Sequence, residues 1–347
     1  MISGCILCED LNAELTEEHI FPLNAGGGLH ARILCKDCNS ILGSYVDGPY
    51  LRQKHIELAR MTYKIKGRAR AIPQPLSGVH EVQGNRGPMR IRLNAAGKAI
   101  VVGSAPSLRP VEDGLELTVH IDATERENLP VIIRSTLERH FRSQEGLAKG
   151  WTLEQKENAI RNAIAGAEAT PTETDHTPFN VRGTWSLCLK AVFTEHVKVL
   201  YEVACLEFGK AFFHSEEGKK LRTFLREQCR PDADFDLESV ALELRVVPIL
   251  SDEIVALLDH LTDSSRYATH LVIAVRGGLV CSMFGSGAIL SLDSFALDDD
   301  DSKVYFNKVN GRCRVMPFPE LIHEANSRTR ECLSSELSAS SQEISRR

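Results

Sequence analysis

The sequence predicts an α+β protein in which a small N-terminal module, held by cysteines, precedes a larger mixed body. Four of the ten cysteines lie in the first 38 residues, and from residue 49 onward helical periodicity alternates with period-two segments. Hydrophobic residues make up 43% and charged residues 25% of the 347, which is typical of a globular protein. This length allows two or three domains.

The composition and the first residues also indicate the cellular location of the protein. No stretch approaches the roughly 20 apolar residues that a membrane-spanning helix needs. Residues 1–5 lack a basic segment followed by an apolar core, so we expect no signal peptide, no membrane partner and a cytoplasmic location. There the cysteines are expected to be thiols or metal ligands rather than disulfides. The net charge of −6 argues against a nucleic-acid binder, but a small basic site can sit on a larger acidic body.

The N-terminal cysteines form two Cys-x-x-Cys pairs, Cys5 with Cys8 and Cys35 with Cys38. Two such pairs can supply four thiolates to one tetrahedral zinc ion. The 26 residues between Cys8 and Cys35 leave room for a hairpin between the pairs. The pattern therefore favours a structural zinc site, with no open coordination position, over four unrelated core cysteines. The other six cysteines are scattered and are interpreted as small hydrophobic residues.

Residues 49–70 indicate a basic helix and its exit, with Leu51, Leu58 and Met61 at helical spacing and Pro73 beyond. The basic residues of this segment are Arg52, Lys54, Arg60, Lys64, Lys66, Arg68 and Arg70. They could clamp phosphates and make binding sensitive to salt. The alternative is an ordinary solvated helix face, and the position beside the cysteine module favours phosphate binding.

The remaining chain alternates between strand and helix patterns. The segments predicted as strands are 89–93, 99–102, 115–121, 240–250, 270–275, 279–284 and 288–292. The segments predicted as helices are 124–166, 185–208 (ended by Gly209) and 215–229. Within 185–208 the apolar positions Leu189, Phe193, Leu200 and Ala204 are expected to be core.

These patterns divide the chain into five parts. The predicted parts are 1–48 (cysteine module), 49–75 (basic helical connector), 76–172 (strand-rich, then helical), 178–333 (mixed α+β) and 334–347 (a disordered tail).

The residues between and beside the cysteine pairs resemble the HNH endonuclease family, in the branch whose ββα-metal fold is held by a four-cysteine zinc. The chain has the run Glu18 to Pro22 (Glu-His-Ile-Phe-Pro) and two glycines at 26–27. It then has Cys38-Asn39 and, shortly after, Leu42-Gly43. This combination is more specific than any one of its parts, and it covers about an eighth of the chain.

The resemblance implies a role for each matching position. His19 matches the general base that takes a proton from the attacking water, a role that suits a neutral imidazole. Glu18 and Asn39 match the ligands of a catalytic divalent metal, and their oxygens suit Mg²⁺ or Mn²⁺. That metal would polarise the scissile phosphate.

The chain departs from the family pattern at two places. The acid before His19 is Glu rather than Asp, and the last histidine of the family name is absent. Asp47 is the nearest candidate for an auxiliary metal ligand, although it reads equally well as a helix-end residue before Gly48-Pro49. His30 and His55 could contact substrate, but a surface position is the simpler interpretation for each.

We therefore expect an endonuclease that hydrolyses phosphodiester bonds in DNA, with RNA not excluded. Residues 178–333 are hypothesised to select the target, assemble the protein as a homodimer, or respond to a protein or small-ligand activator. Analogy with the family points to prokaryotic genome defence or a mobile element. The alternative is a zinc module that binds nucleic acid or protein without cutting.

Overall fold

The computed structural model describes 2–67, 70–75, 77–81, 88–93, 99–104, 106–111, 114–119, 121, 123–143, 147, 150–169, 186–230, 233–249, 252–263, 266–295, 297 and 301–330. Two compact units make up the chain. The first joins residues 1–73 to residues 187–347, so both ends of the sequence build one body. The second is residues 74–186, which lie between these two segments in the sequence.

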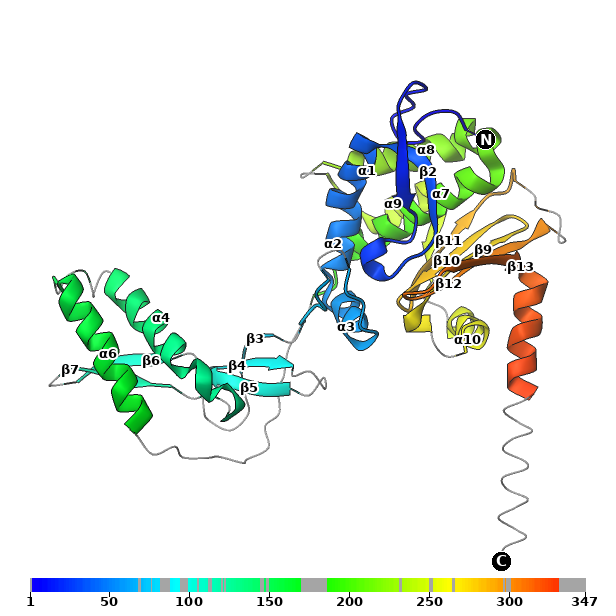
Figure 1. The fold of residues 1–347 in the computed structure, drawn as a ribbon. Helices are drawn as coiled ribbons and strands as arrows, with labels where there is room; N and C mark the ends of the chain where they lie inside the picture. The colour runs from blue at the N-terminus through cyan, green and yellow to red at the C-terminus, as the bar shows by residue number, and fades with distance from the viewer. Residues whose placement is uncertain are drawn as a thin grey trace, which may run out of the picture. The chain divides into compact units, whose positions relative to one another are not determined.

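The N-terminal module is a hairpin followed by a helix, as expected. Strand β1 (Leu15–His19) pairs antiparallel with β2 (His30–Cys35), and α1 (Lys36–Leu42) follows directly (Figure 1). A short 3-10 turn, η1 (Leu23–Ala25), lies in the loop between the strands. The fold class predicted from the sequence is thus confirmed, with the four cysteines in this strand–helix region.

The basic segment after the module is broken into short helices. A π-helical turn, η2 (Gly43–Asp47), continues α1 into α2 (Gly48–Leu51), and α3 (Lys54–Thr62) follows after a break. The break occurs because the backbone of Gln53 is extended, with φ −62° and ψ 133°, rather than helical.

The C-terminal part of the first unit contains a six-stranded antiparallel sheet in the order β13-β12-β9-β10-β11-β8 (Figure 1). Its strands are β8 (Val246–Pro248), β9 (Thr269–Val275), β10 (Gly278–Met283), β11 (Ser286–Ser291), β12 (Lys303–Lys308) and β13 (Cys313–Pro317). The predicted strand at 270–275 and the hairpin of 279–284 with 288–292 are confirmed.

The sheet is covered on both faces because its side chains alternate in direction. Val272 and Cys281 belong to a core that also contains residues of the N-terminal module, such as Leu34. Ile273 and Phe306 belong to a separate core against α10 (Asp252–Leu261) and the helix at 318–330. The N-terminal module therefore shares one hydrophobic core with the C-terminal part.

The long helix α7 (Leu189–His214) is the centre of the shared core. Its backbone leaves helical geometry at Gly209, with φ 58° and ψ −137°, as the predicted helix end at that glycine requires. Phe193 and Leu200 are buried as expected, but the prediction for Leu189 is wrong, because its side chain is 51% exposed in the first turn of the helix.

Two more helices follow α7. The helix predicted at 215–229 is α8 (Glu216–Gln228), and the Ser215 hydroxyl caps it by accepting a hydrogen bond from Gly218 N at 3.0 Å. The strand predicted at 240–250 is wrong over most of its length. It is the helix α9 (Leu237–Leu244), which the Asp236 carboxylate caps at Ser239 N, and only β8 is extended.

Among its described residues, the second unit contains small sheets followed by helices. Strands β3 (Gly78–Glu81), β4 (Pro88–Leu93) and β5 (Ala99–Ser104) form one sheet, and β6 (Ser107–Val111) pairs with β7 (Gly114–Thr118). Helix η3 (Ala123–Asn128) leads into α4 (Leu129–Arg142), which packs with α6 (Leu153–Ala169) through Ile133, Leu137, Phe141 and Ile160. The strands predicted at 89–93, 99–102 and 115–121 and the helices predicted within 124–166 are confirmed, although their ends differ by a few residues.

Within the described residues, every helix falls short of the length and apolar content that crossing a bilayer would require. The predicted tail at 334–347 lies outside the described residues.

Candidate functional site

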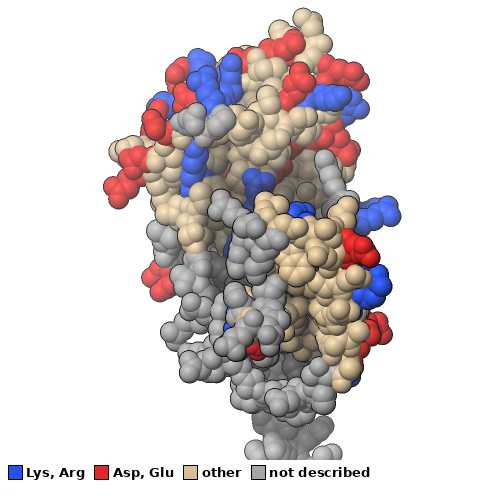
Figure 2. Space-filling view, turned by 90° about the vertical axis from the view of Figure 1, so that its left-hand side faces the viewer, with Lys and Arg blue, Asp and Glu red and all other residues tan. Residues whose placement is uncertain are grey.

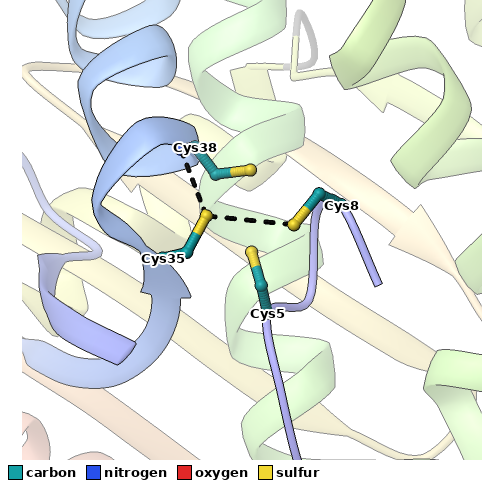
Figure 3. Close-up of side chains that lie close together, drawn as sticks. All are labelled: Cys5, Cys8, Cys35 and Cys38. Atoms are coloured by element: carbon teal, nitrogen blue, oxygen red, sulfur yellow. Dashed lines mark hydrogen bonds between the residues drawn. The ribbon is translucent and has the colours of Figure 1, made fainter. Parts of the chain in front are cut away.

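The four N-terminal cysteines converge on one point. Cys5 and Cys8 come from the loop before β1, whereas Cys35 and Cys38 come from the end of β2 and the first turn of α1 (Figure 3). Their sulfur atoms all lie within 4.8 Å of one another, and those of Cys8 and Cys35 are 3.8 Å apart. A tetrahedral ion with metal–sulfur bonds of about 2.3 Å would separate its sulfurs by about 3.8 Å. The donor set and its spacing therefore fit a structural zinc ion.

Backbone hydrogen bonds to the cysteine sulfurs also favour metal binding at this site. Cys35 caps α1, and its sulfur accepts a hydrogen bond from Cys38 N at 3.5 Å (Figure 3). Burial acts to raise the pKa of Cys5, but hydrogen bonds from the backbone of Cys35, Cys8 and Leu7 outweigh it and leave that pKa lowered. Burial raises the pKa of Cys38, and the neighbouring sulfurs of Cys35, Cys5 and Cys8 raise it further because they oppose its ionisation. A cation between the sulfurs would relieve that opposition.

His19 lies on the partly exposed face of the hairpin. In the β1–β2 ladder it is opposite His30, and the two ring centroids are 5.9 Å apart. Glu17, two residues before His19, shares that face, and its carboxylate lies 3.4 Å from Nδ1 of His30. The outer face of the hairpin thus presents two imidazoles and one carboxylate together.

Glu18 lies on the opposite face of β1, toward the interior. Its side chain is buried, and its Oε1 is 2.7 Å from Nζ of Lys198 in α7. The same ammonium is 2.9 Å from Oδ1 of Asp47 and 3.4 Å from the carbonyl oxygen of His19. The structure therefore brings together Glu18 and Asp47, the two acidic candidates for metal binding, through a lysine from the C-terminal part of the chain.

The Glu18–Asp47 pair does not fit a divalent ion in this arrangement. Carboxylate oxygens would contact Mg²⁺ at about 2.0–2.1 Å, whereas here they surround the ammonium of Lys198 at hydrogen-bonding distances of 2.7 and 2.9 Å. The cation held by the two carboxylates is the protein's own lysine.

Asn39 holds the backbone of β1. Its Nδ2 donates to the carbonyl oxygen of Glu17 at 2.9 Å and to Oγ1 of Thr16 at 3.2 Å. The Thr16 hydroxyl in turn donates to the carbonyl of Leu34 across the hairpin. Asn39 therefore links α1 to the strand that ends in His19, at the irregularity in the ladder between Thr16 and Glu17.

The glycine loop of the hairpin is held by the C-terminal sheet. His270 and Asn307 are opposite each other on β9 and β12, and both are fully buried. Nε2 of His270 is 2.9 Å from the carbonyl oxygen of Ala25. The Asn307 amide accepts from Gly28 N at 2.7 Å and donates to the carbonyl of Gly26 at 3.3 Å.

The predicted basic residues fall in different surroundings. The ammonium of Lys54 is paired with Glu57 at 2.8 Å, and Arg60 is half-buried, so burial lowers its pKa. Arg52, Lys64 and Lys66 are exposed, whereas Arg68 lies outside the described residues. His55 is half-buried.

An open hollow of about 450 Å³ lies beside the glycine loop. Its lining includes Gly26, Gly27, Lys64, Lys66 and Asn310. Two exposed lysines at a hollow bordered by glycine backbone form a surface suited to an anion.

Sequence reasoning missed Lys198, Asn307 and His270. Lys198 had a signal, because it lies with Glu195 and Glu202 on one face of a largely apolar stretch of helix. Buried charges of this kind are rarely unpaired. Asn307 and His270 had no comparable signal, since their partners are backbone atoms more than 200 residues away.

Comparison with known proteins agrees with the geometry of the N-terminal module. No curated protein and no solved structure matches the chain. Residues 5–55, which contain all four cysteines and the hairpin, match the model of a family described as HNH endonuclease. Residues 5–55, named the HNH module, are therefore similar to HNH endonucleases, and their four cysteines form a cluster that could hold a zinc ion.

Proposed function

We propose that the protein is a metal-dependent endonuclease that hydrolyses phosphodiester bonds in DNA. The observation that carries this proposal is the position of His19 at the end of β1, next to His30 on a partly exposed face and within the HNH match. A general base must reach both a water molecule and the substrate, and a half-buried imidazole at the end of a rigid hairpin satisfies both needs.

His19 would act as the general base that takes a proton from the attacking water. Its Cα position is set from both sides, because Asn39 holds the carbonyl of Glu17 and Lys198 approaches the carbonyl of His19 itself. Rigid placement of this kind lowers the entropic cost of reaching the transition state.

A divalent ion, Mg²⁺ or Mn²⁺, would supply Lewis-acid polarisation of the scissile phosphate when bound. Glu18 and the amide oxygen of Asn39 are the proposed ligands, with Asp47 as an auxiliary one. For Glu18 and Asp47 this role requires a change in their ion pairs with Lys198.

Substrate binding is proposed at the basic residues that follow the module, above all Lys64 and Lys66 at the hollow beside the glycine loop. Lysine and arginine side chains are interspersed with acidic ones on the face drawn in Figure 2. A bound phosphate responds mainly to the charges nearest to it, so the net charge of −6 does not exclude binding at these lysines.

The experiment that tests the function is cleavage of supercoiled plasmid with Mg²⁺ or Mn²⁺. We expect nicking or linearisation by the unmodified protein, and its loss in His19→Ala, in Asn39→Ala and in EDTA. His323→Ala, an exposed histidine of the helix at 318–330, is the matched control and should cleave normally.

An absence of cleavage at every metal concentration, together with DNA binding that weakens with salt, would favour the alternative of a zinc module that binds without cutting. Single-stranded RNA in the same assay separates DNA from RNA as substrate. A role in prokaryotic genome defence, an activator bound by the C-terminal part, and a homodimer for double-strand breaks are further proposals that the same samples can test.

A further inference from the structure

The loop that carries Cys5 and Cys8 is held from two sides. Ile6, between the two cysteines, is buried. Its backbone N–H donates to the carbonyl of Ile33 in β2 at 2.9 Å, and its carbonyl accepts from the hydroxyl of Tyr201 in α7 at 2.5 Å. The backbone inside the first cysteine pair therefore joins β2, which leads into the second pair, to a helix of the C-terminal part.

A second contact with the C-terminal part lies directly after Cys8. The carboxylate of Glu9 accepts a hydrogen bond from Nε of Arg222 in α8 at 2.9 Å. Arg222 is buried, and its Nη1 donates to the carbonyl of Phe213 at 3.0 Å. Its guanidinium also lies 4.5 Å from the centre of the Phe213 ring. The end of α7 thus fixes the guanidinium that holds Glu9, and a planar guanidinium loses little freedom in such a contact.

The two cysteine pairs differ in their local support. Cys35 and Cys38 belong to the end of β2 and the first turn of α1, whereas Cys5 and Cys8 lie in a turn that belongs to neither a strand nor a helix. An irregular loop has to be ordered before its thiolates can bind an ion together with the other pair, and this ordering costs affinity. Contacts that order the loop in advance remove part of that cost.

We propose that Tyr201 and Arg222 are positioning residues of the zinc site, so that zinc retention by the HNH module depends on α7 and α8. Tyr201 acts on the backbone between the two cysteines, and Arg222 acts on the residue that follows them. Both lie far outside residues 5–55, the part that matches the family. The proposal goes beyond the nuclease function and does not depend on it.

The test is the rate at which the full-length, zinc-loaded protein gives up its zinc to a chromogenic chelator, at a temperature where every variant is folded. Tyr201→Phe removes only the hydroxyl, and Arg222→Met removes the guanidinium. We expect each variant to release zinc about tenfold faster than the unmodified protein, because residues that orient metal ligands commonly change metal affinity by this factor or more.

Each variant has a matched control. Arg226 lies on the same helix, 3.7 Å from the same Glu9 carboxylate, but it is exposed. Exposed ion pairs contribute little, so Arg226→Met should release zinc at the unmodified rate. Tyr305→Phe should do so too, because the Tyr305 hydroxyl bonds to Glu207 rather than to the cysteine loop.

A further variant separates positioning from a general loss of stability. Asn307→Ala removes a contact between the glycine loop and the C-terminal sheet, in the same unit but not at the cysteine loop. At an equal loss of unfolding free energy, Tyr201→Phe should release zinc faster than Asn307→Ala. If Arg222→Met does not fold, Tyr201→Phe decides alone, since it leaves the guanidinium and its contacts in place.

Zinc release at the unmodified rate by the folded variants overturns the proposal. Equal acceleration in Asn307→Ala at equal stability overturns it as well, because zinc retention would then follow the stability of the whole unit. An unmodified protein that binds no zinc overturns it together with the four-cysteine site. Cleavage is not measured, so failure of the nuclease function leaves this test unaffected.

Discussion

The side chain of Asn307 in β12 accepts a hydrogen bond from the backbone N–H of Gly28, 279 residues earlier in the sequence, at 2.7 Å. Its Nδ2 donates to the carbonyl of Gly26 in the same loop. The loop that follows the candidate general base is therefore held by the C-terminal sheet, and the HNH module does not stand alone.

Asn307→Ala is expected to lower the free energy of unfolding by about 1–3 kcal/mol, because it leaves the half-buried Gly28 N–H without its acceptor and the buried Gly26 carbonyl without one of its donors. Chemical denaturation monitored by circular dichroism measures this. Asn326→Ala is the control, since its exposed side chain lies on the helix at 318–330, contacts His260 at 3.2 Å and should cost less. Equal losses in the two variants would contradict the role given to Asn307.

Gly27→Ala is expected to destabilise the hairpin loop. A Cβ at this position would lie 2.1 Å from the carbonyl oxygen of Phe21, which is backbone and has to move. Gly43→Ala is the matched control, because a Cβ there meets nothing within 4 Å and alanine favours the helix by roughly 1 kcal/mol. Thermal unfolding should shift down for the first variant and stay level or rise for the second. A Gly27→Ala midpoint as high as that of the unmodified protein would refute the close approach.

Cys5→Ser and Cys35→Ser are each expected to remove bound zinc and to unfold the N-terminal module. Elemental analysis should find about one zinc per unmodified chain and much less in either variant. Cys188→Ser, an exposed cysteine outside the cluster, should keep its zinc. Full zinc in Cys35→Ser would rule out the four-cysteine site.

Stability should fall as the pH drops below 6.5. Burial lowers the pKa of His270 from 6.5 to about 4, so the unfolded chain takes up this proton more readily than the folded one. The stabilising contribution is complete above pH 6.5 and is lost as the pH falls toward 4, with a full size of about 3 kcal/mol. Denaturant titrations from pH 7.5 to 4 measure it.

The comparison for this pH dependence is His270→Gln, which can still donate to the carbonyl of Ala25 but does not titrate in this range. Its stability should depend less on pH between 6.5 and 4. Identical pH profiles would assign the acid sensitivity to other groups, such as His196, whose pKa burial also lowers.

The double variant Lys64→Gln with Lys66→Gln is expected to weaken DNA binding and to reduce the slope of log affinity against log salt by about 2. Fluorescence anisotropy at several salt concentrations gives this slope. Lys303→Gln is the control, because its ammonium is paired with Glu207 at 3.0 Å. An unchanged slope in the double variant would remove these lysines from the DNA-binding surface.

Local patterns in the sequence were enough to predict much of the fold. The two Cys-x-x-Cys pairs, the alternation in 89–93 and 270–275, and the cap at Ser215 each depend on residues a few positions apart. The prediction at 240–250 was wrong because a short apolar run with β-branched residues is compatible with both states, and the cap at Asp236 favoured the helix.

The sequence by itself determined the cysteine site and the HNH pattern, since these follow from residue types at short spacing. Only the tertiary structure decided that Glu18 faces inward to Lys198 while His19 faces the other side of the same strand. It also decided that Asp47 and Glu18 share one lysine 151 and 180 residues later in the chain. The physical reason is that the packing of α7 in the common core brings these distant residues together. Short-range periodicity in the sequence does not predict such a contact.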